Sequence, residues 1–187
     1  MNPTNLCNKV TTSTTEVMSK LFLGDDGEHQ AGVSKSYDGP TQHATYTGDY
    51  TTKGNATGLI WKTCSQGLTG ATCTTGTAKT LVWANANDDP TDGCTALNSE
   101  NGGDGYAGIN SWRLPNIDEL ITLVDYGSSG PAINTTAFPG TDTNDYWSST
   151  TRATDDLTAL KVNFLAGTVG NAIKTSQLYN VRCVSGS

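Results

Sequence analysis

The stretch from Trp112 to Gly127 constrains the fold more than any other part of the chain, because several local signals agree there. Asn116 can cap a helix, and Glu119 stands three residues later, where its carboxylate can reach back to the cap amide. Gly127 can end the helix in the left-handed conformation. The apolar residues that fall on one helix face are Ile117, Leu120, Ile121 and Val124. We therefore expect an amphipathic helix whose apolar face belongs to the core.

The other segments predict short strands and polar loops that pack on this helix. Apolar runs and two-residue alternation indicate strands at residues 58–62, 146–150, 159–165, 171–174 and 179–184. The pattern of residues 77–87 predicts a further helix. A polar segment of about 20 residues, 88–108, is long for a loop in a compact domain, so we expect it to be functional or tied down. Residues 1–45 are polar and weakly patterned, and predict an N-terminal arm (extended, or with a short helix from Ser13) before a main domain at 46–187.

The composition favours a loop-rich β protein with a small core. Hydrophobic residues make up only 35% of the 187 residues, and 21 are glycine. The net charge of −7, with 11 scattered basic residues, argues against nucleic acid and anionic membranes as partners. The sequence contains no apolar run long enough to span a membrane and no visible signal peptide, so we expect no membrane insertion, with a leader removed or another route of export.

Five cysteines suggest an oxidising compartment. Cys64 and Cys73 bracket a glycine-rich loop and can close a hairpin, and Cys94 can then pair with Cys183 near the last strand. Four cysteines allow three connectivities, so this pairing is an expectation only. Cys7 would be left free or would pair between chains. Metal binding by these cysteines is the weaker interpretation, since there is no C-x-x-C and only His29 and His43 are available.

Seven ordered blocks of the sequence resemble a known bacterial family. They begin at residues 58, 112, 123, 131, 137, 146 and 181, and read GLIW, WRLPNIDEL, LVDY, PAIN, AFP, YWSST and VRCV. Together with a lead-in at residues 25–33, they are similar to the C-terminal domain of a collagen-like adhesin (Lcl type), over about residues 25–184. Seven blocks in order are far more specific than a single short motif.

The resemblance implies an α+β, C-type-lectin-like fold. In that fold two helices flank small twisted antiparallel sheets, the N- and C-terminal strands pair, and long loops present a ligand surface. Relatives are extracytoplasmic, often adhesins or tips of surface proteins, and some are diversified by retroelements that vary codons of the last strands and loops. Leu160 departs from the family, whose members often have an aromatic residue there. The low isoelectric point argues against an inherited affinity for sulfated polysaccharides.

The resemblance also divides the residues into a framework and a ligand surface. Large aromatics supply most of a small core, and the two framework arginines are expected to anchor loops rather than contact ligand. The expected framework residues are Trp61, Trp112, Arg113, Leu120, Ile121, Trp147 and Arg182. The expected ligand-binding residues lie on the C-terminal strands and loops, where scaffold-mounted loops carry binding groups. They are Arg152, Thr154, Asp155, Asp156, Lys161, Asn163, Asn171, Lys174, Thr175, Gln177 and Tyr179.

No cofactor is expected, although calcium deserves consideration at two acidic loops. Residues 88–93 have Asp at the first and fifth places of a calcium loop, but Pro at the third and no Glu at the twelfth. Residues 142–145 are also acidic, and turns rich in Asp are usually only turns. No catalytic residues are expected, because neither histidine stands near a nucleophile in the framework blocks.

The function expected from the sequence is non-enzymatic binding of a cell-surface protein or glycan, outside the cell or displayed on a cell envelope or virion. One alternative is a structural subunit of a surface appendage or virion, with residues 1–45 as an arm for oligomer assembly and Cys7 as a cross-link. A second alternative is an oxidase related to the formylglycine-generating enzyme, which shares a related fold and uses a copper-binding cysteine pair.

Overall fold

The structure is a computed structural model that describes residues 35–186. The predictions for the first part of the chain lie outside these residues: the short helix from Ser13, the family lead-in at 25–33, Cys7 and His29. The described chain is a mixed α+β unit of small, mostly antiparallel sheets and short helices. No helix among the described residues is both long and apolar enough to cross a membrane.

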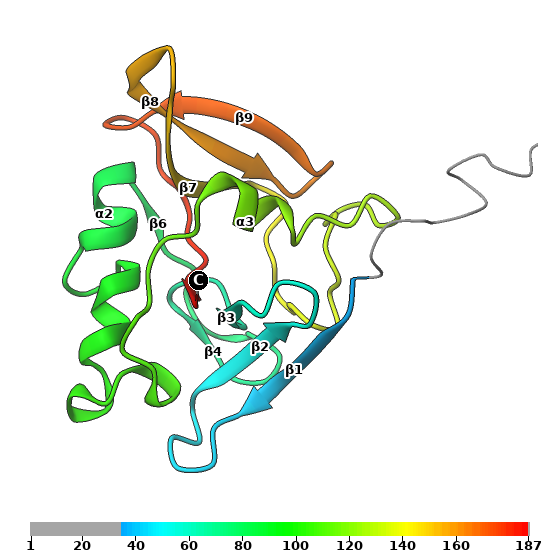
Figure 1. Ribbon diagram of the computed structural model, residues 1–187, viewed down its shortest axis with the longest axis vertical. Coiled ribbons are helices and arrows are strands. Elements are labelled where there is room, and N and C mark those ends of the chain that lie inside the picture. Colours follow the sequence, from blue (N-terminus) through cyan, green and yellow to red (C-terminus); the bar gives the residue numbers. More distant parts are fainter. Residues whose placement is uncertain (1–34, 187) are drawn as a thin grey trace, which may run out of the picture. The chain divides into compact units, whose positions relative to one another are not determined.

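The first sheet joins the beginning and the end of the described chain. Its strands, in spatial order, are β1 (Tyr37–Gln42), β2 (Tyr50–Gly54), β3 (Ile60–Lys62) and β11 (Val184–Ser185), all antiparallel (Figure 1). The strand predicted at 58–62 is confirmed in its second half as β3. The boundary at residue 45 stays a prediction; on its N-terminal side β1 pairs with β2, and the Tyr37 ring contacts Phe138 edge-on at 5.1 Å.

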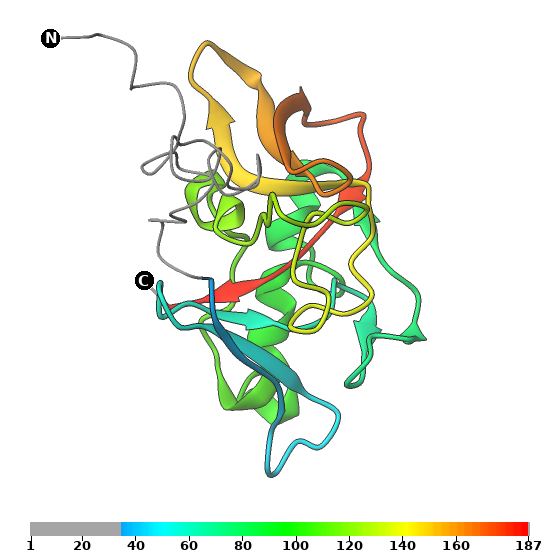
Figure 2. The same cartoon turned by 90° about the vertical axis from the view of Figure 1, so that its right-hand side faces the viewer.

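The second sheet carries most of the C-terminal third of the chain. Its strands, in spatial order, are β6 (Thr80–Leu81), β10 (Tyr179–Asn180), β7 (Asp145–Arg152), β8 (Asp155–Asn163) and β9 (Thr168–Ile173). Only the β7–β10 pair is parallel. Figures 1 and 2 show that β8 and β9 lie at the end of this unit opposite the β1–β2 hairpin. A third, two-stranded sheet, β4 (Leu68–Thr69) and β5 (Thr75–Gly76), lies in and just beyond the loop between Cys64 and Cys73.

The helices are short. They are α2 (Trp83–Asp88), the 3-10 turns η1 (Cys94–Ser99), η2 (Asn101–Gly103) and η3 (Tyr106–Gly108), and α3 (Ile117–Ile121). The three 3-10 turns occupy the segment predicted as a long loop. That segment is tied down by the Cys94–Cys183 disulfide, and by Asp49, whose carboxylate accepts from Asn101 and from the Ala107 amide.

The helix predicted between Asn116 and Gly127 begins as expected but ends early. Asn116 and Glu119 form the predicted capping box, with both hydrogen bonds at 2.8 Å. The helix stops after Ile121, and Val124 instead forms a bridge with Ile133. Gly127 does not end it. The prediction was wrong about length because a long-range β contact buries Val124 without another helical turn.

Two other segment predictions also need correction. In 77–87 only the second half is helical, because Leu81 pairs with Tyr179 of β10 and its carbonyl accepts a hydrogen bond from the Trp147 indole at 2.8 Å. The strand predicted at 179–184 is divided into β10 and β11, which belong to different sheets. The chain crosses between the two sheets at residues 181–183, which are buried.

Two core clusters hold the unit together. The first contains Trp61, Leu120 and Phe138, with Ile121 packed at its margin, and the second contains Trp112, Trp147 and the Cys94–Cys183 sulfurs. Both disulfides considered in the sequence are present, Cys64–Cys73 and Cys94–Cys183. Burial of bulky aromatics and a disulfide closing 89 residues both stabilise a domain with few apolar residues.

Arg182 is fully buried between the two sheets. Its guanidinium donates to the carbonyl oxygens of Lys62 and Thr63 and, at 2.8 Å, to the Thr141 hydroxyl. The charged group also lies 5.1 Å from the centre of the Phe138 ring. Burial lowers the pKa of Arg182. The side chain therefore cross-links three separate segments from inside the fold and is not accessible to a ligand.

Candidate functional site

The expected ligand-binding residues gather mainly on one region, which we call the C-terminal surface. It comprises residues 152–157 at the tip of the β7–β8 hairpin and residues 168–178 of β9 and the turn that follows (Figure 2). The two parts are adjacent because β8 pairs with β9 from Thr158–Ile173 to Asn163–Thr168. The Lys174 ammonium also donates to the Thr151 hydroxyl at 2.8 Å, which joins the turn to the hairpin.

The hairpin tip is compact rather than a loose loop. Arg152 pairs with Asp155 across a turn whose two central residues are Ala153 and Thr154. Arg152, Thr154 and Asp156 are exposed, and Asp155 is half-buried and accepts a hydrogen bond from the Leu157 amide. The segment predicted as an exposed loop is thus a paired hairpin that presents its side chains in a defined order.

The second part of the surface combines polar and apolar side chains. Asn171, Thr175 and Gln177 are exposed, and Lys174 is half-buried. Large apolar side chains stand among them, with Val169 47% exposed, Ile173 51% and Leu178 59%, and Leu157 on the neighbouring hairpin tip is 74% exposed. Exposed apolar groups beside polar ones are typical of interaction surfaces.

Three of the expected ligand-binding residues are instead engaged within the protein, around Asp145. The Lys161 ammonium lies 2.7 Å from the Asp145 carboxylate, and the Asn163 amide donates to the same carboxylate oxygen at 2.9 Å. The Tyr179 ring packs against Trp147, with 4.7 Å between ring centres, and lies under the Lys161 ammonium. The role of these three residues in binding stays a prediction, but the polar groups of Lys161 and Asn163 already have a partner in Asp145.

A groove lies between α2, the start of α3 and β7, next to the C-terminal surface. Its volume is about 470 Å³, and its lining combines an aromatic ring with hydroxyl, amide, carboxylate and guanidinium groups. The lining residues used below are Trp83, Asp88, Arg113, Asn116 and Ser149. Lys174 connects the two regions, because its ammonium lies 4.1 Å from the centre of the Trp83 ring.

Sequence reasoning missed this groove. The sequence pattern predicts a helix at Trp83, a polar loop considered for calcium at Asp88 and a strand at Ser149, so nothing in it brings the three together. The signal that was available is Trp83 itself, followed by Ala-Asn-Ala-Asn-Asp88. Trp83 is the aromatic residue of this short helix, and although it packs against the second core cluster it stays partly exposed.

Arg113, one of the expected framework arginines, borders the groove and is bound on its other side. Its guanidinium makes two hydrogen bonds, of 2.7 and 2.6 Å, to the Glu119 carboxylate, and a third to the Gly186 carbonyl. The bonds to Glu119 raise the pKa of Arg113. Burial opposes ionisation of Glu119, but the bonds from Arg113 and the Asn116 amide outweigh it and lower the pKa of that carboxyl.

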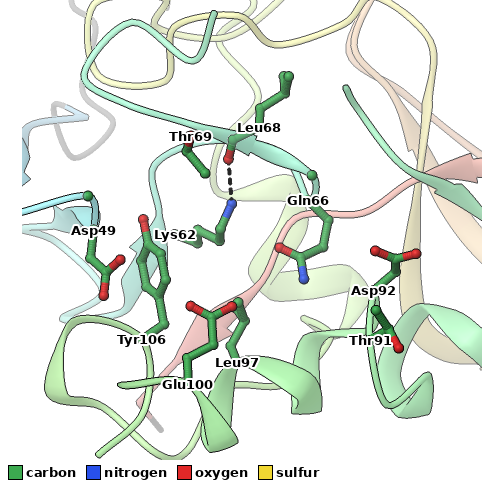
Figure 3. A pocket seen from close by; sticks show the side chains of 12 residues that line it. Asp49, Lys62, Gln66, Leu68, Thr69, Thr91, Asp92, Leu97, Glu100 and Tyr106 are labelled. Atoms are coloured by element: carbon green, nitrogen blue, oxygen red, sulfur yellow. Dashed lines mark hydrogen bonds between the residues drawn. The ribbon is translucent and has the colours of Figure 1, made fainter. Parts of the chain in front are cut away.

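A second hollow, of about 280 Å³, contains a buried lysine (Figure 3). The Lys62 ammonium donates to the carbonyl oxygens of Leu68 at 2.8 Å and of Cys64 and Ser65 at 3.4 Å. Burial, with a smaller contribution from the nearby Arg182 cation, lowers the pKa of Lys62 to about 8. Because all three donors meet main-chain carbonyls, Lys62 holds the disulfide-closed loop in place.

The acidic loops considered for calcium form turns in the structure. The Asp89 carboxylate accepts from the amides of Thr91 and Asp92 at 2.9 Å, and these bonds lower its pKa. Asp142 accepts likewise from the Asn144 amide. Between residues 35 and 186, no three or more His, Cys, Asp or Glu side chains come together in a way that could hold a metal ion.

Fold and surface together define a disulfide-braced α+β module that presents exposed side chains on a pair of hairpins. The chain belongs to the family of the Lcl C-terminal domain, whose model matches residues 50–185. No curated protein matches the chain. Membership in this family indicates an adhesin-like surface module, and the two disulfides fit a location outside the cytoplasm.

Proposed function

We propose that this chain is a ligand-binding module that recognises a protein or glycan on another surface through the C-terminal surface. The observation that carries the proposal is the concentration of exposed polar and apolar side chains at the β7–β8 tip and on β9. The groups that stabilise the fold lie elsewhere. They are Arg182, three buried tryptophans and both disulfides, and in the described chain none of them makes a hydrogen bond to the exposed tip residues. Such a division lets surface residues contact a ligand, or change, without loss of the fold.

The proposed architecture is C-type-lectin-like. Three features support it: strands from the beginning and end of the described chain share a sheet, helices α2 and α3 flank the strands, and a disulfide ties the region after α2 to the last strand. On that architecture the C-terminal strands and loops are the ligand face, as the family resemblance implies.

We also propose that binding involves no catalysis. His43, the histidine in the described chain, accepts hydrogen bonds at Nδ1 from the amides of Thr45 and Tyr46 and stacks on the Tyr46 ring. The His43 side chain therefore stabilises the turn that follows β1. The formylglycine-type alternative would need free thiols for copper, whereas Cys64, Cys73, Cys94 and Cys183 are oxidised in pairs. Copper titration with a cysteine-containing peptide tests that alternative directly.

Diversification by a retroelement is a further part of the proposal. Its support is the location of the exposed residues in the last strands, on a frame that does not depend on them. The observation that tests it is genomic: a near-copy of the segment encoding residues 145–184, next to a reverse transcriptase and differing mainly at adenines. A genome without such a copy removes diversification and leaves ligand binding intact.

The function is tested by a glycan-array and cell-surface binding screen. Wild type is compared with a variant whose residues 152–156 and 174–179 are replaced by Gly-Ser, and with a control whose exposed β1–β2 turn, residues 44–48, is replaced in the same way. We expect the first replacement to abolish binding and the control to retain it. Binding that survives in the first variant and is lost in the control would contradict the proposal.

A further inference from the structure

Trp83 differs from the other tryptophans of the chain. Of the four, Trp61, Trp112 and Trp147 are buried in the core, whereas Trp83 is only partly buried and lines the groove. Its ring is held in place, because the indole N–H donates to the Ser148 carbonyl at 2.7 Å. The Lys174 ammonium lies 4.1 Å from the ring centre, the ring also packs against the second core cluster, and its exposed part lines the groove.

The polar groups around Trp83 are only partly used. Asn116 accepts from the Glu119 amide through its side-chain carbonyl, and within residues 35–186 its side-chain N–H groups have no acceptor. Over the same residues the exposed Ser149 hydroxyl makes no hydrogen bond. Asp88 receives one bond, from the Asn87 amide, and has acceptor capacity left. The groove thus offers both donors and acceptors beside an aromatic face.

The charges in the groove nearly cancel. Of the two charged lining residues, Arg113 is neutralised by its two bonds to Glu119 and Asp88 is negative, and the Lys174 ammonium beside Trp83 brings a positive charge. A sulfated or phosphorylated ligand needs uncompensated positive charge, which this groove lacks. A sugar ring has a C–H face that packs on an aromatic ring and hydroxyl groups that need both donors and acceptors. The volume of about 470 Å³ falls within the usual range for small-ligand sites.

From these features we propose that the groove lined by Trp83, Asp88, Asn116 and Ser149 binds one or two rings of an uncharged saccharide. This inference rests on the proposed function and narrows its ligand class from a protein or glycan to a neutral glycan. In the proposed complex the sugar packs on the part of the Trp83 ring that lines the groove. Its hydroxyls bind Asp88, Asn116 and Ser149, while the neighbouring C-terminal surface contacts the rest of the chain that carries the sugar.

Trp83 also provides a local reporter. Acrylamide quenches exposed tryptophans, and the other three are buried, so quenching of the native protein reports mainly on Trp83. The full chain is first screened on an array of neutral and sulfated glycans. Quenching is then measured with the best neutral oligosaccharide, or with chitotriose, mannotriose and maltotriose if no neutral glycan is retained. We expect a neutral oligosaccharide to be retained and to reduce the quenching constant at least about twofold, and a heparin hexasaccharide to have no effect.

Two substitutions test whether the protection of Trp83 from quenching comes from sugar bound in the groove. Ser149→Tyr fills the groove from an exposed position and should abolish both array binding and protection of Trp83. Thr45→Tyr adds the same side chain on the exposed β1–β2 turn, outside both the groove lining and the C-terminal surface, and should retain protection. Circular dichroism checks that both variants are folded.

The outcomes separate this inference from the proposed function. Retention of sulfated glycans only, or no protection of Trp83 by any neutral sugar, overturns the groove proposal. So does full binding by Ser149→Tyr. The groove proposal can fail while replacement of the C-terminal surface still abolishes cell-surface binding. In that case the module binds a protein or a charged ligand, and the proposed function stands. If binding survives both Ser149→Tyr and the replacement of the C-terminal surface, the ligand binds elsewhere, and both the groove proposal and the proposed function are overturned.

Discussion

A 2.8 Å hydrogen bond from the Arg182 guanidinium to the Thr141 hydroxyl joins two segments 41 residues apart inside the fold. The same guanidinium donates to the carbonyls of Lys62 and Thr63. Arg182 therefore links the crossover between β10 and β11 to β3 and to the segment that leads into β7. This arrangement makes a buried cation a structural cross-link in a chain whose apolar content is low.

Replacing Arg182 by Met should destabilise the protein severely. The substitution keeps much of the side chain's length but leaves the Thr63 carbonyl and the Thr141 hydroxyl without a donor, so we expect a loss of about 3 kcal/mol or more. Urea unfolding measures the change. The matched control is Arg152→Met at the exposed hairpin tip, which should change the unfolding free energy by less than about 0.5 kcal/mol. Similar losses in the two variants would contradict this role.

The two disulfides should contribute unequally. Cys94–Cys183 closes 89 residues and Cys64–Cys73 only 9. The chain-entropy relation gives about 4.5 kcal/mol for the long closure and about 2.5 kcal/mol for the short one. Double Cys→Ala variants of each pair, compared by chemical unfolding, should differ in that order. Equal losses, or a greater loss for the short loop, would show that unfolded-chain entropy is not the main contribution.

Stability should rise with pH in the alkaline range because of Lys62. The unfolded chain keeps the Lys62 proton up to the ordinary pKa of 10.5, whereas the folded protein releases it near a pKa of about 8. Between these values the unfolded state binds more protons, so the unfolding free energy increases with pH, by up to about 1 kcal/mol per pH unit. Urea unfolding from pH 7 to 10 on wild type and Lys62→Met isolates the effect, since other titrating groups are shared. If the unfolding free energy of wild type minus that of Lys62→Met is constant or falls as the pH rises, this role of Lys62 is refuted.

The Arg113–Glu119 pair should show measurable coupling. Its two short bonds are partly exposed, so we expect about 1 kcal/mol in a double-mutant cycle of Arg113→Gln and Glu119→Gln at pH 7. The glutamine at 119 can still accept from the Asn116 amide, which keeps the capping box out of the cycle. The pKa of Glu119 is lowered, so its contribution is present above the unfolded value and falls as the carboxylate protonates. Coupling that persists undiminished at pH 2 would contradict an ionic origin.

The sequence predicts best the features that depend on nearby residues. The capping box at Asn116 and Glu119, the β7 strand and the alternation of Val162 and Phe164 with more exposed neighbours are all read from short spacings, and all are present. The helix end is different, because it depends on the bridge between Val124 and Ile133. No local signal at residue 122 reveals such a contact.

The same distinction applies to the candidate site. The exposed hairpin tip around Thr154 was predictable from the polarity of its residues. The groove was not, because Trp83, Asn116 and Ser149 come from α2, the α3 cap and β7, which only the fold brings together. Likewise, Lys161 and Asn163 have the polarity of binding residues, but their partner Asp145 lies across the β7–β8 pair. Sequence distinguishes polar from apolar positions better than it distinguishes free from engaged polar groups.

Binding and folding should be separable, and serine substitution on the C-terminal surface tests this most directly. In one variant Arg152, Thr154, Asp156, Asn171 and Gln177 become Ser. In the control Asp38, Gln42, Thr45, Lys53 and Asn55 become Ser, which removes the same charges from exposed positions on and around β1 and β2.

The measurement is the affinity of each variant for the ligand retained in the binding screen, at a urea concentration well below the unfolding transition. We predict at least about tenfold weaker binding for the C-terminal variant, wild-type affinity for the control, and native circular dichroism for both. Wild-type affinity in the C-terminal variant, with weakened binding in the control, would contradict the account.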